Sequence, residues 1–441
     1  MRLTVRNIGK IKDTVIEFSN LTIISGENDV GKSTIGKLLF AIIQAFNTFP
    51  NAYHKEFAEK QNNFLQWLYF QVRRHPELYE NQELRTYVFN LRRSITSTIE
   101  DYPYIAEKIA SFIEKDHFND PVSISILQKM EKNILSFYQN NNFEKNNKKF
   151  IYESIKHEFC KKLVSFNTEF SYLRLDYHNQ NIFEIKFDDN KIIEYTGTDF
   201  FPLRDATFIE GPAILQYSPA ISTNSLGEIN FSKNSINIPY HIIDLSNKLK
   251  KSNSKFMNDL STYSLWDESI IDNPDIQKPV IEWKIKDFFN GELYFNSEIE
   301  SFAFKTNGNE ILTNNVSSGI KALSILDLLI KSDYLNKDTL LILDEPETNL
   351  HPAWQKQYSE QLCKLVKKGV NILINTHSPY MLECLKTYSD ITKTPTKFYL
   401  AHKNNNNHVS FKDTQGSISP ILEILAEPLR KLSLETSNDD F

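Results

Sequence analysis

A glycine-rich segment near the start of the chain has the residue types that hold phosphate groups. Residues 26–33, Gly-Glu-Asn-Asp-Val-Gly-Lys-Ser, place a lysine and a hydroxyl directly after the second of two glycines. In this pattern the glycines let backbone N–H groups surround phosphate oxygens, the lysine neutralises the β- and γ-phosphates, and the hydroxyl binds Mg²⁺. The spacing therefore predicts a site for ATP and Mg²⁺. Its predicted ATP-binding residues are Gly26, Asn28, Asp29, Val30, Gly31, Lys32, Ser33 and Thr34.

An acidic pair follows an apolar run far downstream. Residues 340–343 are apolar enough to form a buried parallel strand, and Asp344 and Glu345 follow at its end. Ligands bind at the carboxyl ends of such strands. We therefore expect Asp344 and Ser33 to hold Mg²⁺, and Glu345 to orient and deprotonate the attacking water. A surface acidic turn is the plainer interpretation, but four apolar residues leading into two carboxylates favour the catalytic one. Glu347 is expected to be structural or solvated.

A third polar segment ends the strand predicted over residues 370–376. His377 lies 33 residues after Asp344, a separation that fits one strand–helix–strand crossover. The adjacent strand tip would then bring His377 beside the γ-phosphate, where it would sense that group. A lone histidine is more often a surface or core group, so this interpretation depends on the other two segments. We predict Lys32, Glu345 and His377 as the catalytic residues.

A fourth segment, residues 315–321, opens an apolar helix. Ser317 or Ser318 is expected to cap this helix, and Gly319 follows. A capped helix N-terminus is also a favourable position for an anion. The structural and the phosphate-binding interpretations of this segment are therefore compatible.

The elements that must position these residues alternate between strands and helices. The first 44 residues have a β-β-loop-α pattern, with strands at 3–8, 15–18 and 21–25 and a helix at 34–46. Beyond residue 318 we expect helices at 319–334, 352–368, 379–386 and 418–432, and strands at 339–343, 370–376, 396–401 and 408–412. Strands that alternate with helices imply a largely parallel sheet covered on both faces.

The middle of the chain has a different pattern of hydrophobic residues. From residue 47 onward, aromatic and aliphatic residues recur at helical spacing, and the stretch is divided into several helices by Pro50, Pro76, Pro103 and Pro121. A β-hairpin is expected at 182–195, a strand at 206–210, a lysine-rich helix at 240–260 and strand pairs within 280–311. We therefore predict an ATPase domain formed by residues 1–46 and 205–441, with a mostly helical insertion at 47–204 that ends in the hairpin.

The composition is that of a globular protein. The chain has 441 residues, of which 40% are apolar and 24% charged, so wholesale disorder is not expected. A net charge of −6 and a pI near 6.0 argue against a uniformly basic surface but leave local basic patches open. Residues 1–6 lack the apolar core of a signal peptide, and no apolar run approaches the ~20 residues that cross a bilayer. Because the three cysteines are widely spaced, we expect a cytoplasmic protein without disulfides or a zinc site.

Together these segments resemble the ATP site of ABC-type ATPases of the SMC/RecF/OLD group. Residues 26–33 resemble the Walker A loop and residues 340–345 the Walker B strand, while His377 is similar to the switch histidine. Residues 349–352, Asn-Leu-His-Pro, resemble the D-loop, and residues 318–321 resemble the signature motif. That motif departs from the usual Ser-Gly-Gly-Gln or Ser-Gly-Gly-Glu pattern at Ile320 and Lys321. The weak candidates for a Q-loop are Gln44 and Gln216.

The resemblance implies an α/β P-loop NTPase fold, an ABC-type ATPase head with an antiparallel β subdomain and a large helical insertion. In this family the signature motif completes the ATP site of a second subunit. A homodimer that encloses two ATP molecules, or a higher oligomer of such dimers, is therefore expected. The signature residues that would act across the interface are Ser318, Gly319 and Lys321, and the D-loop residues are Asn349, Leu350 and His351.

The sequence of residues 344–352, Asp-Glu-Pro-Glu-Thr-Asn-Leu-His-Pro, resembles the corresponding segment of OLD-like and defence-associated ATPases. Residues 209–212, Ile-Glu-Gly-Pro, resemble a further segment of that subgroup. OLD nucleases carry a Toprim nuclease domain after the ATPase, whereas 64 residues follow His377 here and their acids are scattered. The leading hypothesis is an ATP-driven switch, similar to the ATPase of Septu-type anti-phage systems. It would control a separate nuclease or toxin in response to DNA or a phage-derived trigger.

Two other classes of function are open to the same residues. A RecF-like DNA-binding ATPase acting in repair would contact phosphates through Lys248, Lys250, Lys251 and Lys255, with Arg73, Arg74, Arg92 and Arg93. Such charges are more often solvated helix faces. A nucleotide-binding subunit of a transporter is disfavoured by the large insertion and by the sequence of residues 347–352.

Overall fold

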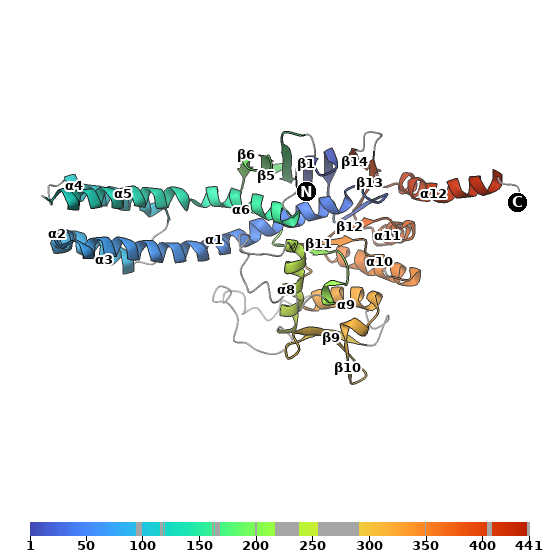
Figure 1. The fold of residues 1–441 in the computed structure, drawn as a ribbon. Helices are drawn as coiled ribbons and strands as arrows, with labels where there is room; N and C mark the ends of the chain where they lie inside the picture. The colour runs from blue at the N-terminus through green and yellow to red at the C-terminus, as the bar shows by residue number, and fades with distance from the viewer. Residues whose placement is uncertain are drawn as a thin grey trace. The chain divides into compact units, whose positions relative to one another are not determined.

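The chain forms two compact units. The computed structural model describes residues 1–93, 99–114, 118, 120–160, 163, 168–198, 201–216, 238–254, 291–348, 350–403 and 408–438. One unit, which we call the head, comprises Met1–Gln44 and Glu153–Phe441. The other, the helical unit, comprises Ala45–Tyr152. Figure 1 labels many of the helices and strands of both.

Most strands of the head belong to one mixed sheet. Eleven described strands pair in the order β6-β5-β4-β1-β2-β14-β13-β3-β12-β11-β7. Their bounds are β1 Arg2–Ile8, β2 Ile11–Glu17, β3 Leu21–Gly26, β4 Ser171–Tyr177, β5 Gln180–Phe187, β6 Ile192–Gly197, β7 Asp205–Ile209, β11 Thr339–Asp344, β12 Asn371–Thr376, β13 Thr396–Lys403 and β14 Val409–Asp413.

The parallel half of this sheet is its most buried part. Strand β3 pairs in parallel with β12 and β13, and β11 pairs in parallel with β12 and β7. Every residue of β3 and β11 is buried, as expected for strands covered on both faces. The apolar runs of the sequence therefore predict these strands correctly, and their carboxyl ends meet at one edge.

The antiparallel half includes the predicted β-hairpin. Strands β5 and β6 pair around residues 188–190, and the Oδ1 atom of Asp188 accepts hydrogen bonds of 2.8 Å from the backbone N–H groups of Asn190 and Lys191. The hairpin joins the main sheet because β5 pairs with β4, and β4 pairs with β1, Leu173 opposite Val5. The compact helical unit thus ends at Tyr152, not at the predicted residue 204.

Helices and a smaller sheet complete the head. The helices are α8 Tyr240–Ser254, α9 Ser318–Lys331, α10 Pro352–Lys367, α11 Pro379–Thr392 and α12 Ser419–Asn438, with the 3-10 turn η3 Thr313–Asn315. The antiparallel strands are β8 Glu292–Asn296, β9 Ser301–Thr306 and β10 Asn309–Leu312. Residues 280–284, the first strand expected within 280–311, and residue Lys255 lie outside the described residues. One apolar core joins the buried side chains of β3, β11, β12, α9, α10 and α11.

The first helix is longer than its sequence pattern predicts. Helix α1 spans Lys32–Arg74 and continues through Pro50, although the prediction ended it at residue 46. Proline removes one helical hydrogen bond, but aromatic packing holds the preceding residue in place. The ring of Phe49 lies 4.9 Å from that of Phe143 and 5.4 Å from that of Phe150. Tertiary contacts therefore override a local helix-breaking signal.

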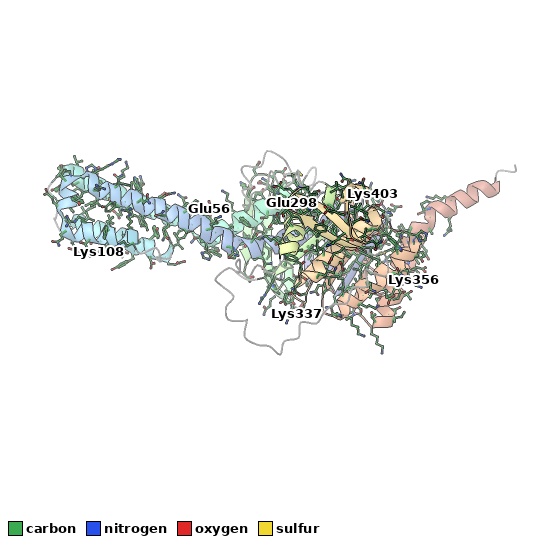
Figure 2. The ribbon with its side chains drawn as sticks, turned by 90° about the horizontal axis from the view of Figure 1, so that it is seen from below. Glu56, Lys108, Glu298, Lys337, Lys356 and Lys403 are labelled. Atoms are coloured by element: carbon green, nitrogen blue, oxygen red, sulfur yellow. The ribbon has the colours of Figure 1, made fainter. Side chains whose placement is uncertain are left out.

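The helical unit has its own core. Its other helices are α2 Pro76–Glu80, α3 Gln82–Arg93, η1 Ile99–Asp101, α4 Tyr102–Glu114, α5 Pro121–Asn140 and α6 Phe143–Glu158, whose last turns belong to the head. Phe64 stacks on Phe137 at 4.4 Å, and the buried Tyr102 stacks on the same ring at 4.9 Å. Figure 2 adds the side chains of both units. No helix among the described residues has the length and hydropathy needed to span a bilayer.

Gly36 allows α1 to pack closely against the sheet. A Cβ atom at this position would come within 2.8 Å of Ile342 Cγ2 and 2.9 Å of Phe208 Cε2, both fully buried. Carbon atoms pack best at ~3.5–4.0 Å. Gly36→Ala is therefore expected to lower the free energy of unfolding by about 1–3 kcal/mol in chemical denaturation. Gly211→Ala is the matched control, since its Cβ meets nothing within 4 Å; equal midpoints for both variants would contradict this packing.

Candidate nucleotide site

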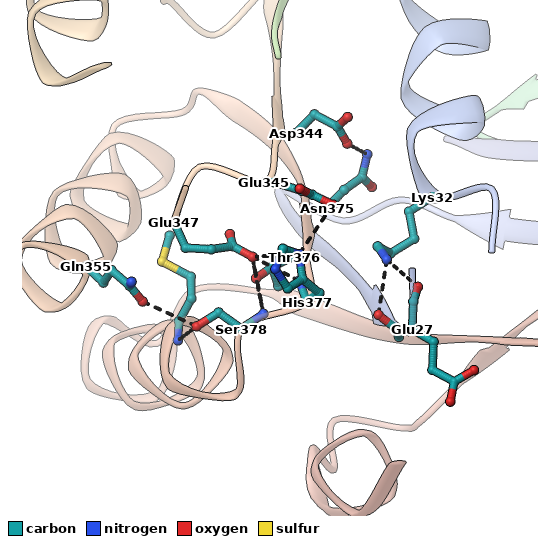
Figure 3. A network of polar contacts seen from close by, with 12 residues as sticks. Glu27, Lys32, Asp344, Glu345, Glu347, Gln355, Asn375, Thr376, His377 and Ser378 are labelled. Atoms are coloured by element: carbon teal, nitrogen blue, oxygen red, sulfur yellow. Dashed lines mark hydrogen bonds and ion pairs between the residues drawn. The ribbon is translucent and has the colours of Figure 1, made fainter. Parts of the chain in front are cut away.

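The strand order brings three distant segments of the sequence to one edge of the sheet. Strand β12 lies between β3 and β11, with Asn375 in register with Ile24 on one side and with Asp344 on the other. The loop after β3, the acids after β11 and the segment after β12 therefore follow three neighbouring strands. Figure 3 shows their side chains gathered at this edge.

The glycine-rich loop has a backbone that requires its glycines. A Cβ on Gly26 (φ 154°) would come within 2.2 Å of the carbonyl oxygen of Ala401, and Gly31 has a φ of 72°. Positive φ is readily adopted by glycine. Helix α1 begins directly after the loop at Lys32, so the loop delivers the helix N-terminus to the sheet edge. This is the geometry that the sequence pattern predicts for phosphate binding.

The amine of Lys32 folds back on the loop. Only 5% of the residue is exposed, and Nζ donates to the carbonyl oxygens of Gly26 at 3.1 Å and Glu27 at 2.6 Å. Burial lowers the pKa of Lys32, while the charges of Glu345 and Asp344 oppose that effect. A buried ammonium that rests on carbonyl oxygens is prepared to bind an anionic ligand, because phosphate oxygens would replace weaker partners.

The other predicted loop residues divide between exposed and buried positions. Asn28 and Asp29 are exposed and Val30 is buried. Asp29 (φ 63°) forms an ion pair with Lys10, and the hydrogen bond from that lysine lowers the pKa of Asp29. The backbone N–H of Thr34 donates to the carbonyl oxygen of Gly31 at 3.2 Å. The loop is therefore closed by its own contacts and by Lys10.

Oxygen ligands suited to Mg²⁺ lie next to each other. Asp344 is 7% exposed and accepts hydrogen bonds from Ser33 and, at 2.8 Å, from the side-chain amide of Asn375. Burial raises the pKa of Asp344, and these two hydrogen bonds oppose the rise. A carboxylate and a hydroxyl are the hard oxygen donors that Mg²⁺ prefers. The residues present therefore fit the predicted metal.

Glu345 has a strained backbone. Its φ is 48°, its N–H donates to the carbonyl oxygen of Asn375 at 2.9 Å, and its side chain is 40% exposed. A non-glycine residue with positive φ costs of order 1–3 kcal/mol and is often found at functional sites. The strain directs Glu345 away from the line of the strand, and Oε1 lies 3.3 Å from Nδ1 of His377. The predicted base and the predicted sensor are thus neighbours.

Glu347 holds the segment that carries His377. It is 7% exposed, and Oε1 accepts hydrogen bonds from the Thr376 hydroxyl at 2.7 Å and from the backbone N–H groups of His377 at 2.9 Å and Ser378 at 3.2 Å. Glu347 is therefore a structural residue, as one of the two expectations had it, and is not solvated. These three hydrogen bonds hold the segment that carries His377 in place.

The signature segment lies at the start of α9. Ser317 occupies the N-cap position, although its side chain makes no capping hydrogen bond, and Ser318 and Gly319 begin the helix. Lys321 is 4% exposed, and burial lowers its pKa. The lysine that replaces the usual polar residue of the motif is thus largely buried within the head.

The D-loop candidates have structural contacts in the single chain. Leu350 is buried in the apolar core of the head. The Nδ1 atom of His351 accepts a hydrogen bond of 3.2 Å from the N–H of Ala353 and caps α10. Asn349 lies outside the described residues.

The hydrogen bonds of the two Q-loop candidates, Gln44 and Gln216, go to residues outside the glycine-rich loop. Gln44 donates hydrogen bonds of 2.6 Å to Asp205 and to the carbonyl oxygen of Ala206, at the amino end of β7. Because ligands bind at the carboxyl ends of parallel strands, Gln44 is wrongly placed for this role. Gln216 is exposed, and its backbone N–H donates to Ala213. The position beside Asp344 is taken instead by Glu210, which directly follows β7.

Comparisons with known proteins identify the family. The model of the AAA ATPase domain matches residues 1–382. The chain belongs to the AAA ATPase domain family. No curated protein matches this AAA ATPase domain protein.

Solved structures similar to this AAA ATPase domain protein include two SMC heads. One is an SMC head bound to the C-winged helix domain of ScpA, with 10% identity, a TM-score of 0.41, and coverage of 96% of this chain and 99% of that chain. The other is the SMC head domain from Thermotoga maritima, with 11% identity, a TM-score of 0.35, and coverage of 94% and 98%. The fold of this AAA ATPase domain protein is an α/β P-loop head with a helical insertion.

Proposed function

We propose that the protein binds and hydrolyses ATP with the residues gathered at the edge of β3, β12 and β11. The observation that carries this proposal is the convergence of Lys32, Asp344 and Glu345 on neighbouring strand ends. The water oxygen attacks the γ-phosphorus, the bond from that phosphorus to the β–γ bridging oxygen breaks, and Glu345 accepts a proton of the water. The products are ADP and phosphate.

Each of the remaining residues has one task in this proposal. Lys32 exchanges its carbonyl partners for β- and γ-phosphate oxygens. Ser33 and Asp344 would hold Mg²⁺, and the bound ion supplies positive charge to the phosphates. His377 donates a hydrogen bond to the γ-phosphate, and Glu347 keeps its backbone in place.

We infer further that two chains close around two ATP molecules, with Ser318, Gly319 and Lys321 of one chain completing the site of the other. The support is the position of this segment at a helix N-terminus, where partial positive charge favours a phosphate. The buried Lys321 would add a full charge. Mass measurement in solution tests the arrangement: ATP should convert monomers into dimers, and dimers that form equally well with Ser318→Arg would contradict it.

We propose the complex as an anti-phage switch in which ATP turnover controls a separate nuclease or toxin. The experiment is expression of the tagged chain with its neighbouring genes. A second gene product should copurify, and its nuclease or toxic activity should depend on Lys32 of the tagged chain. A chain that protects cells alone, without any associated product, would contradict the proposal.

A second candidate function, DNA binding in repair, is favoured by one surface of the helical unit. We define the arginine–aromatic patch as Tyr69, Phe70, Arg73, Arg74, Phe89, Arg92 and Arg93. Arg92 lies over the ring of Tyr69 at 4.9 Å and Arg93 over that of Phe89 at 5.2 Å. The rings of Tyr69 and Phe89 are 6.4 Å apart, so α1 and α3 contribute to one surface.

The patch has the chemistry that single-stranded nucleic acid requires. Phe70 is 44% and Phe89 is 39% exposed, and residues 64–74 and 84–93 contain no acid. None of its four arginines forms an ion pair with a residue that the structure describes. Exposed aromatic faces stack on bases and free arginines bind phosphates. This surface is basic although the chain as a whole has a net charge of −6.

One lysine that the sequence suggested for phosphate contacts, Lys248, is not available for them. Lys248 is 7% exposed and its amine contacts Asp205 and Asp244, each at 2.8 Å. Because a buried, doubly paired ammonium is not free to bind phosphate, Lys248 is removed from the candidate surface. Lys250 lies over the ring of Phe295 at 5.6 Å.

Binding of a fluorescein-labelled poly-dT strand, followed by anisotropy over a range of salt concentrations, tests the patch. Arg92→Gln/Arg93→Gln should weaken binding at least ~10-fold and reduce the salt slope by roughly 0.7 per lost phosphate contact. Phe70→Ala/Phe89→Ala should reduce the binding free energy by about 1–3 kcal/mol per stacked base, with little change in the salt slope. The control is Lys337→Gln/Lys356→Gln, which removes two exposed charges of the head. Equal loss in the control and arginine variants would contradict a specific surface.

A further inference from the structure

A chain of charged side chains, buried at its inner end, lies beside the proposed ATP site. His241 is 1% exposed, and both of its ring nitrogens face carboxylates. Nδ1 contacts Glu158, and Nε2 lies 3.2 Å from Oε2 of Glu210. The other oxygen of Glu210 lies 3.3 Å from the amine of Lys37. Four side chains thus form one continuous path.

The path joins four elements of the head. Lys37 lies one helical turn after Ser33 on α1, Glu210 directly follows β7, His241 is in the first turn of α8, and Glu158 is the last residue of α6. Glu158 also accepts a hydrogen bond of 3.1 Å from the backbone N–H of His241. The end of α6 and the start of α8 are therefore tied together at the histidine.

Glu210 links the path to Asp344, one of the proposed metal ligands. Leu343 is in register with Ile209, which places Glu210 beside Asp344 at the same edge of the sheet. The charge of Glu210 contributes to the raised pKa of Asp344. Its side chain is 48% exposed, so it is free to adjust when a ligand binds.

The contacts of His241 favour the protonated form of its ring. A histidine can donate from both ring nitrogens only as the imidazolium. Burial opposes that charge, but the hydrogen bonds to Glu158 and Glu210 outweigh it and raise the pKa of His241. The hydrogen bond from His241, with the charge of Lys37, lowers the pKa of Glu210 to about 2. Glu158 is 2% exposed, and breaking a buried charge pair is costly, so the inner end of the path is fixed.

We propose that Glu210 is a positioning residue of the nucleotide site, and that His241 couples its position to the ends of α6 and α8. The inference rests on the proposed ATP hydrolysis. When ATP and Mg²⁺ bind beside Asp344, the half-exposed carboxylate of Glu210 would change its position. Because His241 has no freedom to release the buried Glu158, any shift of Glu210 is passed to α6 and α8. Nucleotide binding would thereby affect α6 and α8, two helices that do not themselves bind phosphate.

Steady-state kinetics tests the positioning role. Glu210→Gln should lower kcat by about 10–100-fold, the effect typical of residues that orient a metal site, with little change in the KM for ATP and a higher Mg²⁺ requirement. The matched control is Glu360→Gln on α10, where Glu360 pairs with Lys364 at 2.6 Å. A merely structural role would lower the folded fraction without separating kcat from KM. A Glu210→Gln protein with wild-type kcat and Mg²⁺ dependence would overturn the inference.

Hydrogen exchange tests the coupling without measuring activity. In the wild type, ATP and Mg²⁺ should slow amide exchange in residues 153–158 and 240–246. His241→Gln/Glu158→Gln leaves no unpaired buried charge, so it should fold and bind ATP but lose this protection. Protection that persists in the double variant would overturn the coupling. A wild-type protein that binds no ATP would contradict the proposed function itself, whereas a wild type that hydrolyses ATP and a silent Glu210→Gln would contradict only this inference.

Discussion

Replacing Lys32 with alanine should abolish nucleotide binding. The ammonium of Lys32 is buried at the sheet edge, and its present partners are the carbonyl oxygens of Gly26 and Glu27. Hydrogen bonds between charged groups contribute about 1.5–3 kcal/mol each, so loss of those to the phosphates should weaken ATP binding by at least ~100-fold. Titration with a fluorescent ATP analogue measures this affinity.

The lysine variant has a matched control and a clear failing outcome. Lys364→Ala removes an amine that pairs with Glu360 on α10, remote in sequence from the glycine-rich loop. It should bind ATP like the wild type. Circular dichroism should show the same helix content in both variants, because among the described residues the Lys32 amine donates only to carbonyl groups of its own loop. Wild-type affinity in a folded Lys32→Ala protein would show that the triphosphate binds elsewhere.

Replacing Glu345 with glutamine should stop hydrolysis and leave ATP bound. An amide cannot accept the proton of the attacking water, and general bases contribute about 10²–10⁴-fold to rate. The substitution keeps the size of the side chain at a position whose φ is 48°. We therefore expect intact nucleotide binding, slow turnover and a stable dimer in the presence of ATP and Mg²⁺.

Phosphate release and mass in solution give separate measurements for the glutamate variant. Lys32→Ala is the comparison that should remain monomeric, because it lacks ATP. Glu360→Gln, a change of the same chemistry on α10, should hydrolyse ATP at the wild-type rate. Hydrolysis by Glu345→Gln at the wild-type rate would show that another residue is the base.

The sequence predicted the elements of the ATP site with nearly correct limits. The strand predicted at 339–343 is β11 Thr339–Asp344, and that at 370–376 is β12 Asn371–Thr376. These predictions succeed because each buried parallel strand is a short apolar run with polar residues at its end. Gly26 and Gly31 were predictable for a similar reason, since positive φ is a local requirement.

Where the sequence failed, distant parts of the chain decided the structure. Helix α1 passes Pro50 because Phe143 and Phe150, about 100 residues away, pack against Phe49. The hairpin β5–β6 joins the head because β4 pairs with β1. Neither contact can be predicted from the local pattern of hydrophobic residues.

The residue types of the ATP site were determined by the sequence alone, because glycine, lysine and carboxylate spacing reflects the chemistry of a phosphate. Their arrangement was decided by tertiary structure, which inserts β12 between β3 and β11. The same holds for Glu210, His241 and Glu158, which are unremarkable when taken singly. Strand order and helix packing bring them within hydrogen-bond distance across 83 residues of sequence, and only such long-range pairing turns scattered polar residues into one path.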